Sequence, residues 1–206
     1  QALARAPMRE TLAAALVLAS GWDGRAPLVD PMCGSGTLAI EAALIARRIA
    51  PGLGRVFAAE RWPETPRALW STCRSGASEE MIPGSGAVIV ASDRDEGAVA
   101  AARANAQRAG VVQDIRFGCG PLSALEPPVG PGWLVMNPPY GVRVGERTAL
   151  RSLYAAFGRL VRERLAGWQV VIVAADAMLL GQTGLTWQPL VETSNGGLRI
   201  RFVARV

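Results

Sequence analysis

The chain contains 206 residues, half of them hydrophobic, which is enough for one well-packed domain. Its net charge is +5, and all 22 basic residues are arginines, a residue type that forms bidentate contacts with phosphate. Either a nucleic-acid partner or a biased genome explains this composition. The chain has no histidine, which excludes the serine and cysteine triads that use a histidine base, together with most zinc sites.

The three cysteines, Cys33, Cys73 and Cys119, are scattered and odd in number, so they predict neither a disulfide framework nor a metal site. A reducing cytoplasm is the expected location. No run of about 18 apolar residues is present, and we therefore expect no membrane-spanning segment. Because the chain begins with Gln1 rather than methionine, we expect a fragment of a longer protein, with a partner domain upstream.

The first part of the chain predicts half of a nucleotide-type α/β unit. A helix is expected from Pro7 to Ser20, and a short strand at residues 27–30. A glycine-containing turn at residues 31–37 follows, and then a second helix at residues 38–49. Strand, glycine turn and helix in immediate succession are typical of nucleotide-binding α/β folds.

Residues from about Pro51 to Gly86 interrupt this alternation and are rich in proline, glycine, tryptophan and arginine. A connection of this length is unusual inside a compact domain and is often functional when ordered. Two interpretations are open: the insertion contacts substrate, or it packs its tryptophans on the edge of the sheet. We assign Trp62 and Trp70 structural roles.

Alternation resumes after the insertion. Strands are expected at residues 87–92, 114–117, 133–136 and 170–174, and helices at 95–109, 148–165 and 175–180. Two final strands, 187–192 and 198–206, are joined by Ser194-Asn195-Gly196-Gly197, which predicts a hairpin with an antiparallel last strand. The predicted fold class is α/β, with a mostly parallel seven-stranded sheet, helices on both faces and a C-terminal antiparallel hairpin.

The most distinctive motif is Asn137-Pro138-Pro139-Tyr140, directly after the apolar strand 133–136. Neither proline can donate to a sheet ladder, and Pro138 pushes Asn137 out of the helical region, so the chain leaves the sheet there. An amide, a run of carbonyls and an aromatic ring therefore lie at the carboxyl end of a strand. Open α/β sheets bind their ligands at this edge.

A second motif, Asp-Pro-Met-Cys-Gly-Ser-Gly, runs from Asp30 to Gly36. It is too short for a dinucleotide-binding loop, and a triphosphate site would need the lysine that the chain lacks. Its glycines allow a ligand to approach the backbone, and its carboxylate suits a cation. Asp93, which ends the next strand, is placed to accept both hydroxyls of a ribose. A positive centre, a ribose and no phosphate describe S-adenosylmethionine, which we predict as the cofactor.

These motifs resemble those of class I S-adenosylmethionine-dependent methyltransferases that carry the N-P-P-Y motif and methylate amino groups. More narrowly, the chain resembles the THUMP-associated RNA methylases, which include the bacterial large-subunit rRNA guanine-N2 methyltransferases. The likeness covers nearly the whole chain, including the insertion. The stretches that carry it are residues 6–13, 28–37, 40–43, 50–53, 60–63, 92–95, 101–106 and 137–141.

The resemblance implies a Rossmann-like class I methyltransferase fold and roles for matching residues. The glycine turn would line the methionine end of the cofactor, and Asp93 would hold its ribose. Asn137 and the Pro138 carbonyl would accept hydrogen bonds from an exocyclic amine, which directs its lone pair toward the methyl group. Tyr140 would stack on a base that is flipped out or unpaired; simple packing in the turn is the alternative. The cofactor-binding set is Asp30, Cys33, Gly34, Gly36, Asp93 and Asn137, and the catalytic set is Asn137, Pro138 and Tyr140.

Some positions allow two interpretations. Relatives place an acid after the third strand to contact the adenine amino group, and this chain has Pro121 there. Either a backbone group replaces the acid or cofactor affinity is reduced. Glu41 either faces the cofactor or balances the dipole at the start of its helix, and Asp95 is expected to be a helix N-cap. Arg143 and Arg147 either contact phosphate or are solvated.

We expect a methyltransferase that acts on an exocyclic amine of an RNA base, guanine N2 in ribosomal RNA. One alternative is another amine or amide target, such as adenine N6 in DNA or RNA. The other is an RNA-associated cofactor-binding module whose catalysis has decayed. We expect a monomer without metal, with residues 1–206 forming one catalytic domain. RNA recognition by an absent upstream domain would make methylation by this chain alone inefficient.

Overall fold

A seven-stranded sheet forms the centre of the computed structural model, which describes residues 8–140 and 147–206. The strands are β1 (Leu28–Asp30), β2 (Ile89–Asp93), β3 (Ile115–Cys119), β4 (Trp133–Met136), β5 (Gln169–Ala174), β6 (Trp187–Asn195) and β7 (Leu198–Arg205). Their order in the sheet is β3-β2-β1-β4-β5-β7-β6. Strands β1 to β5 pair in parallel, and β7 runs antiparallel to both β5 and β6. The predicted mixed sheet with its C-terminal hairpin is therefore confirmed.

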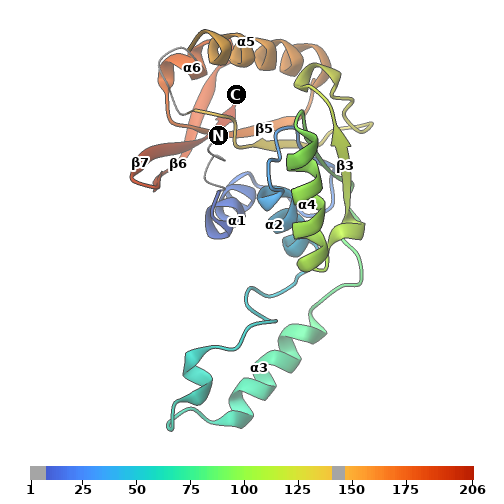
Figure 1. The fold of residues 1–206 in the computed structure, drawn as a ribbon, viewed down its shortest axis with the longest axis vertical. Helices are drawn as coiled ribbons and strands as arrows, with labels where there is room; N and C mark the ends of the chain where they lie inside the picture. The colour runs from blue at the N-terminus through green and yellow to red at the C-terminus, as the bar shows by residue number, and fades with distance from the viewer. Residues whose placement is uncertain (1–7, 141–146) are drawn as a thin grey trace.

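Helices cover both faces of this sheet (Figure 1). The helices of the chain are α1 (Glu10–Ala19), α2 (Thr37–Ala46), α3 (Arg67–Glu79), α4 (Glu96–Arg108), α5 (Arg147–Arg164) and α6 (Ala177–Gly181), with short 3₁₀ helices η1 (Ala58–Arg61), η2 (Val112–Asp114) and η3 (Leu122–Ala124). Of these, α3 and η1 lie away from the sheet. Alternate strand residues point to opposite faces: Leu28 joins the apolar cluster formed with α1, α2 and α4, and Val29 joins the cluster formed with α5. Among the described helices, none has the length and apolarity needed to cross a membrane.

Most element boundaries lie within a few residues of the prediction. Strand β4 has the predicted bounds, and α4 begins after Asp95, whose carboxylate accepts N–H bonds from Gly97 at 2.8 Å and Ala98 at 3.3 Å. The predicted N-cap is therefore confirmed. Helix α1 begins at Glu10, and the expected start at Pro7 lies outside the described residues.

Helix α2 ends at Ala46, three residues before the predicted end at Ile49. Arg48 takes a left-handed conformation with φ of 53°. The N–H of Arg48 then bonds to the carbonyl of Ile45, and that of Ile49 to the carbonyl of Leu44. These two bonds form a Schellman-type ending without the glycine that normally signals one in a sequence.

The insertion at residues 51–86 forms an arm that extends away from the sheet and carries η1 and α3 (Figure 1). The interpretation that its tryptophans pack on the sheet edge is wrong. Trp62 is 61% exposed, and Trp70 stacks on Phe57 inside the arm with ring centroids 5.7 Å apart. Arg74 of α3 completes this local packing by bonding to the Leu53 carbonyl at 2.5 Å and to the Glu60 carboxylate at 2.6 Å.

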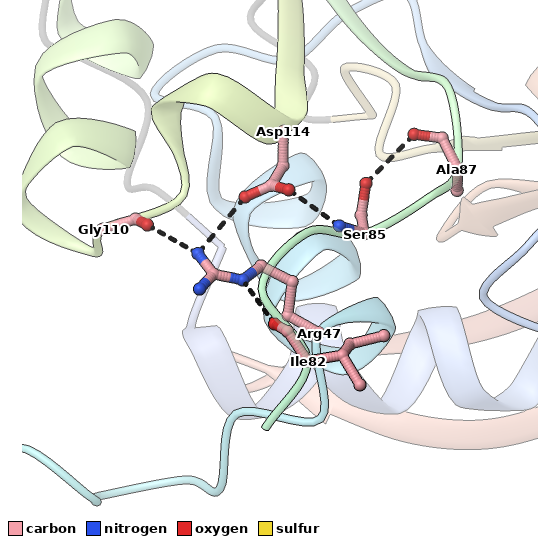
Figure 2. A network of polar contacts seen from close by, with 6 residues as sticks. All are labelled: Arg47, Ile82, Ser85, Ala87, Gly110 and Asp114. Carbon is pink, nitrogen blue, oxygen red and sulfur yellow. Dashed lines mark hydrogen bonds and ion pairs between the residues drawn. The ribbon is translucent and has the colours of Figure 1, made fainter. Parts of the chain in front are cut away.

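The base of the arm is fixed by a network around Arg47, at the end of α2 (Figure 2). Its guanidinium donates to the carbonyls of Ile82 at 3.2 Å and Gly110 at 2.9 Å, and lies 3.4 Å from the Asp114 carboxylate. Asp114 also accepts the N–H of Ser85 at 2.8 Å. The network thus holds the chain where it returns from the arm and enters β2.

Candidate functional site

The sheet order places the carboxyl ends of three neighbouring strands at one edge. β1 lies between β2 and β4, with Asp30 paired to Ala91 and Val29 to Leu134. Asp30, Asp93 and Asn137, predicted from separate parts of the sequence, therefore lie at the same edge. The chain also reverses its direction of winding between β1 and β4, and such switch points are where open α/β sheets form ligand sites.

The glycine turn after β1 shows why its two predicted glycines differ. Gly34 and Gly36 have φ values of 52° and 84°, which favour glycine. A Cβ on Gly36 would lie 2.8 Å from the Cβ of Ala102 in α4, whereas a Cβ on Gly34 would meet no atom within 4 Å. Asn105 of α4 also donates to the Ser35 carbonyl at 2.8 Å. Gly36 therefore allows the turn to pack against α4, and Gly34 faces open space.

Asp93 is oriented by backbone donors on both sides. Its Oδ2 accepts the N–H of Gly34 at 3.0 Å, and its Oδ1 accepts the N–H of Asp95 at 3.1 Å. In addition, the N–H of Gly120 donates to the Asp93 carbonyl at 3.0 Å. The carboxylate is thus fixed beside the glycine turn, and each of its oxygens keeps a lone pair for a further donor.

Asp30 is only 2% exposed. Burial raises the pKa of its carboxyl to about 7, against the opposing effect of a hydrogen bond from the Met32 N–H at 3.2 Å; the negative charge of Asp93 adds to the rise. The same burial, together with the charges of Asp30 and Asp93, raises the pKa of the Cys33 thiol. The site therefore combines two acidic groups with a neutral thiol, and a cation would relieve the repulsion between the carboxylates.

Asn137 presents an acceptor that has no donor. Its Oδ1 is buried, and no group in the described part of the chain hydrogen-bonds to it. Buried side-chain oxygens in folded proteins nearly always have a partner, so an orphan at a strand end calls for an explanation. A ligand with an N–H group would supply the missing donor.

The residues after Asn137 are held from two sides. Tyr154 of α5 donates its hydroxyl to the Pro139 carbonyl at 3.3 Å, and burial raises the pKa of this phenol, so it remains a donor. Asn195, at the end of β6, donates its Nδ2 to the Tyr140 hydroxyl at 3.2 Å. Pro138 is buried between these anchors. Sequence reasoning missed both anchors, because Tyr154 reads as part of an apolar helix face and Asn195 as an ordinary turn residue.

A hollow of about 180 Å³ lies between the ends of β2 and β3. Its lining includes Ser92, Pro121 and Glu126, a carboxylate that sequence reasoning also missed. Glu126 adds a third candidate for the role of the acid that Pro121 replaces. A second hollow, of about 340 Å³, lies at the base of the arm and contains none of the predicted site residues.

The remaining candidates are placed as follows. Glu41 is half-buried, and its pKa is raised by burial and by the charge of Glu10. It lies beyond the first turn of α2, where the helix dipole has little effect, so the dipole interpretation is wrong. Arg147 is exposed at the start of α5, and Arg143 lies outside the described residues. Within the ranges that the structure covers, no cluster of three or more His, Cys, Asp or Glu could hold a metal ion.

A protein-family model identifies the family to which this chain belongs. The model of UPF0020, described as the RMKL-like methyltransferase domain, matches residues 1–195. The chain belongs to this family. Among curated relatives of this RMKL-like domain is the ribosomal RNA large subunit methyltransferase K/L of Pseudoalteromonas atlantica, 40% identical over 96% of the chain and 29% of that protein. The protein of the same name from Alteromonas mediterranea is 41% identical over the same shares. The chain spans less than a third of the length of these relatives.

Solved structures give the same assignment for the RMKL-like domain. SMU.472, crystallised in complex with SAH, matches with a TM-score of 0.91 and 34% identity over 97% of this chain and 53% of that one. A protein from Listeria monocytogenes, named a predicted N6-adenine-specific DNA methylase, matches with a TM-score of 0.82 and 32% identity over 98% of this chain and 52% of its own. The predicted Rossmann-like methyltransferase fold is confirmed. The narrower THUMP association and the roles of individual residues stay predictions.

Proposed function

We propose that this RMKL-like domain is an S-adenosylmethionine-dependent methyltransferase that acts on an exocyclic amine of an RNA base. The observation that carries the proposal is the buried Oδ1 of Asn137 at the switch point of the sheet, which accepts no hydrogen bond from the described residues. An acceptor in this position fits a ligand that brings an N–H group to the strand end. The RNA target is supported by the relatives named as ribosomal RNA methyltransferases.

The donor side fits S-adenosylmethionine, which supplies an electrophilic methyl group on a positively charged sulfur. The acidic groups Asp30 and Asp93 suit a cation, and a bound cation would lower the raised pKa of Asp30 and favour its ionised form. Cys33, Gly34 and Gly36 would line the methionine end, and Gly34 leaves the open space that this requires. Asp93, already oriented by two N–H groups, would accept the ribose hydroxyls with its free lone pairs.

The adenine of this cofactor would occupy the hollow between the ends of β2 and β3. Its lining contains backbone groups of residues 118–121 together with Glu126, so an acceptor for the adenine amino group is available without an acid at position 121. An acceptor supplied in this way would remove the one observation that favoured a decayed, non-catalytic module.

On the acceptor side, Asn137 Oδ1 and the Pro138 carbonyl would each accept a hydrogen bond from the substrate amine. An aromatic amine is a poor nucleophile because its lone pair is delocalised into the ring, and two acceptors favour the pyramidal, more nucleophilic nitrogen. Orientation of this kind is worth about 7–11 kcal/mol in good cases. The amine proton can then pass to water, so a chain without histidine needs no strong base.

Guanine N2 in ribosomal RNA is the target that we propose. The name of the Listeria monocytogenes neighbour favours adenine N6 in DNA as the second candidate, because both targets present an exocyclic amine to the same acceptors. Unmodified ribosomal RNA transcripts and, in parallel, unmethylated DNA are incubated with the chain and S-adenosylmethionine, and digestion followed by mass spectrometry of the nucleosides separates the two candidates. N2-methylguanosine in the RNA that disappears with Asn137→Ala is expected; N6-methyl-2'-deoxyadenosine in the DNA would establish the second candidate instead.

A further inference from the structure

The β6–β7 hairpin reaches the motif that contains Asn137. Figure 1 shows the hairpin extending from the edge of the sheet. At its turn, Asn195 Nδ2 donates to the hydroxyl of Tyr140 at 3.2 Å, a contact between residues 55 positions apart. Gly196 and Gly197 form the turn with φ values of 57° and 83°, and Asn195 pairs with Leu198 across it. The hairpin thus places one amide on the aromatic ring of the candidate site.

The burial of β6 shows that this contact is local. All residues between Trp187 and Asn195 are exposed, and only these two end residues are half-buried. Ser194, Gly196 and Gly197 around Asn195 are exposed as well. Among the described residues, Asn195 is therefore covered by its contact with the site rather than by a core of the hairpin.

Helix α5 holds the same segment from the other direction, because Tyr154 donates to the Pro139 carbonyl at 3.3 Å. Pro139 and Tyr140 are fixed between α5 and the hairpin, while Asn137 Oδ1 accepts no hydrogen bond from residues 8–140 and 147–206. The anchors act on the residues beside the orphan acceptor and do not consume it. This is the arrangement that a preorganised binding site requires.

We propose that Asn195 is a positioning residue that fixes the ring of Tyr140 for stacking on the target base, and that the hairpin turn closes the substrate side of the site. The proposal rests on the proposed function, since it assumes that Tyr140 meets a base. The Tyr140 ring packs at the margin of the apolar cluster on the α1–α2–α4 face, and the hydroxyl is the only group of this side chain that can form a conventional hydrogen bond. Loss of the Asn195 bond would release the ring to other rotamers without removing any contact to the cofactor edge.

A short RNA with 2-aminopurine at one position is the probe, because this base carries its exocyclic amine where guanine does and its fluorescence is quenched by stacking. Affinity and quenching are measured with the complete 206-residue chain and S-adenosylmethionine. Asn195→Ala is expected to weaken binding of the probe by about 2- to 10-fold, the usual effect of one hydrogen bond. Tyr140→Phe should have a similar effect, and the double variant should be no weaker than either single variant.

Two further variants make the test specific. Asn195→Asp should keep near-normal affinity, because the Tyr140 hydroxyl can donate to a carboxylate. Ser194→Ala changes the exposed neighbour on the same strand and should behave as wild type. Affinity for S-adenosylmethionine and the melting temperature should be unchanged in all five variants, which separates positioning of the ring from general destabilisation.

Three outcomes, each with normal cofactor binding, would overturn the inference while leaving the proposed function intact. In the first, the effects of Asn195→Ala and Tyr140→Phe on probe affinity are additive. In the second, Asn195→Ala binds the probe with wild-type affinity. In the third, the probe stays unquenched in the wild-type complex, because no stacking then takes place. Failure of the proposed function itself has a different signature, since wild-type chain would then show no binding of S-adenosylmethionine.

Discussion

Asp30 should make the stability of this chain depend on pH in a way that one substitution removes. Burial raises the pKa of its carboxyl from an ordinary 3.8 to about 7 in the folded chain. The folded state therefore keeps a proton that the unfolded chain has already released. The stabilisation is fully present below about pH 4 and is lost as the pH rises to about 7.

The magnitude follows from the size of this difference. One pKa unit corresponds to about 1.4 kcal/mol, so the whole effect is about 4 kcal/mol, of which about 3 kcal/mol is lost between pH 5 and pH 8. Asn at position 30 has nearly the same shape and no charge. The free energy of unfolding of Asp30→Asn minus that of wild type should therefore rise by about 3 kcal/mol across this pH range.

Urea unfolding of both proteins at pH 5, 6, 7 and 8 measures this difference. Asp95→Asn is the matched control, because Asp95 is an exposed N-cap that asparagine replaces well, and its profile should run parallel to wild type. A difference between Asp30→Asn and wild type that stays constant from pH 5 to pH 8 would refute the reasoning. It would mean that Asp30 is ionised throughout this range and that its burial is relieved by groups other than those named.

Three further predictions concern other parts of the chain. Gly34→Ala should lower the free energy of unfolding by about 1 kcal/mol, because alanine is strained in the left-handed conformation. Gly36→Ala should lower it by about 1–3 kcal/mol more, because the added Cβ would lie 2.8 Å from the Cβ of Ala102. Equal urea midpoints for the two variants would contradict this prediction. Asn137→Ala should lower methyl transfer by about 100- to 1,000-fold while keeping the melting temperature; a large fall in melting temperature would make Asn137 a structural residue. Arg47→Ala should lower the free energy of unfolding by about 2–4 kcal/mol, because its ion pair with Asp114 is largely buried. Arg48→Ala should lower it by less than about 1 kcal/mol, because its ion pair with Glu80 is exposed. Thermal unfolding of the two variants measures this difference.

The parts of the fold that could be predicted are those whose signals are local. Gly132 and Pro138 bracket four apolar residues, so β4 was predicted with its observed bounds. The motif after β4 and the acid after β2 could be brought together before the structure was known, because parallel strands end at the same edge. The hairpin was predicted from its two glycines, which have the positive φ values that such turns need.

The parts that could not be predicted depend on contacts between distant residues. Helix α3 has no buried residue and gains its order from Arg74 and the Phe57–Trp70 stack inside the arm, so no apolar face toward the sheet marks it in the sequence. The bond between Asn195 and Tyr140 is a further example, because a turn asparagine carries no local sign of a partner 55 positions away. Of the predicted motif stretches 6–13 and 137–141, residues 6, 7 and 141 lie outside the described residues.

The central claim is that S-adenosylmethionine binds at the ends of β1 and β2 next to a free acceptor on Asn137. Isothermal titration of the chain with S-adenosylmethionine tests it most directly. We predict saturable binding by wild type and at least about tenfold weaker binding by Asp93→Ala, from which the oriented ribose acceptor is missing. The absence of binding by a folded wild-type chain, or undiminished affinity in Asp93→Ala, would contradict the account.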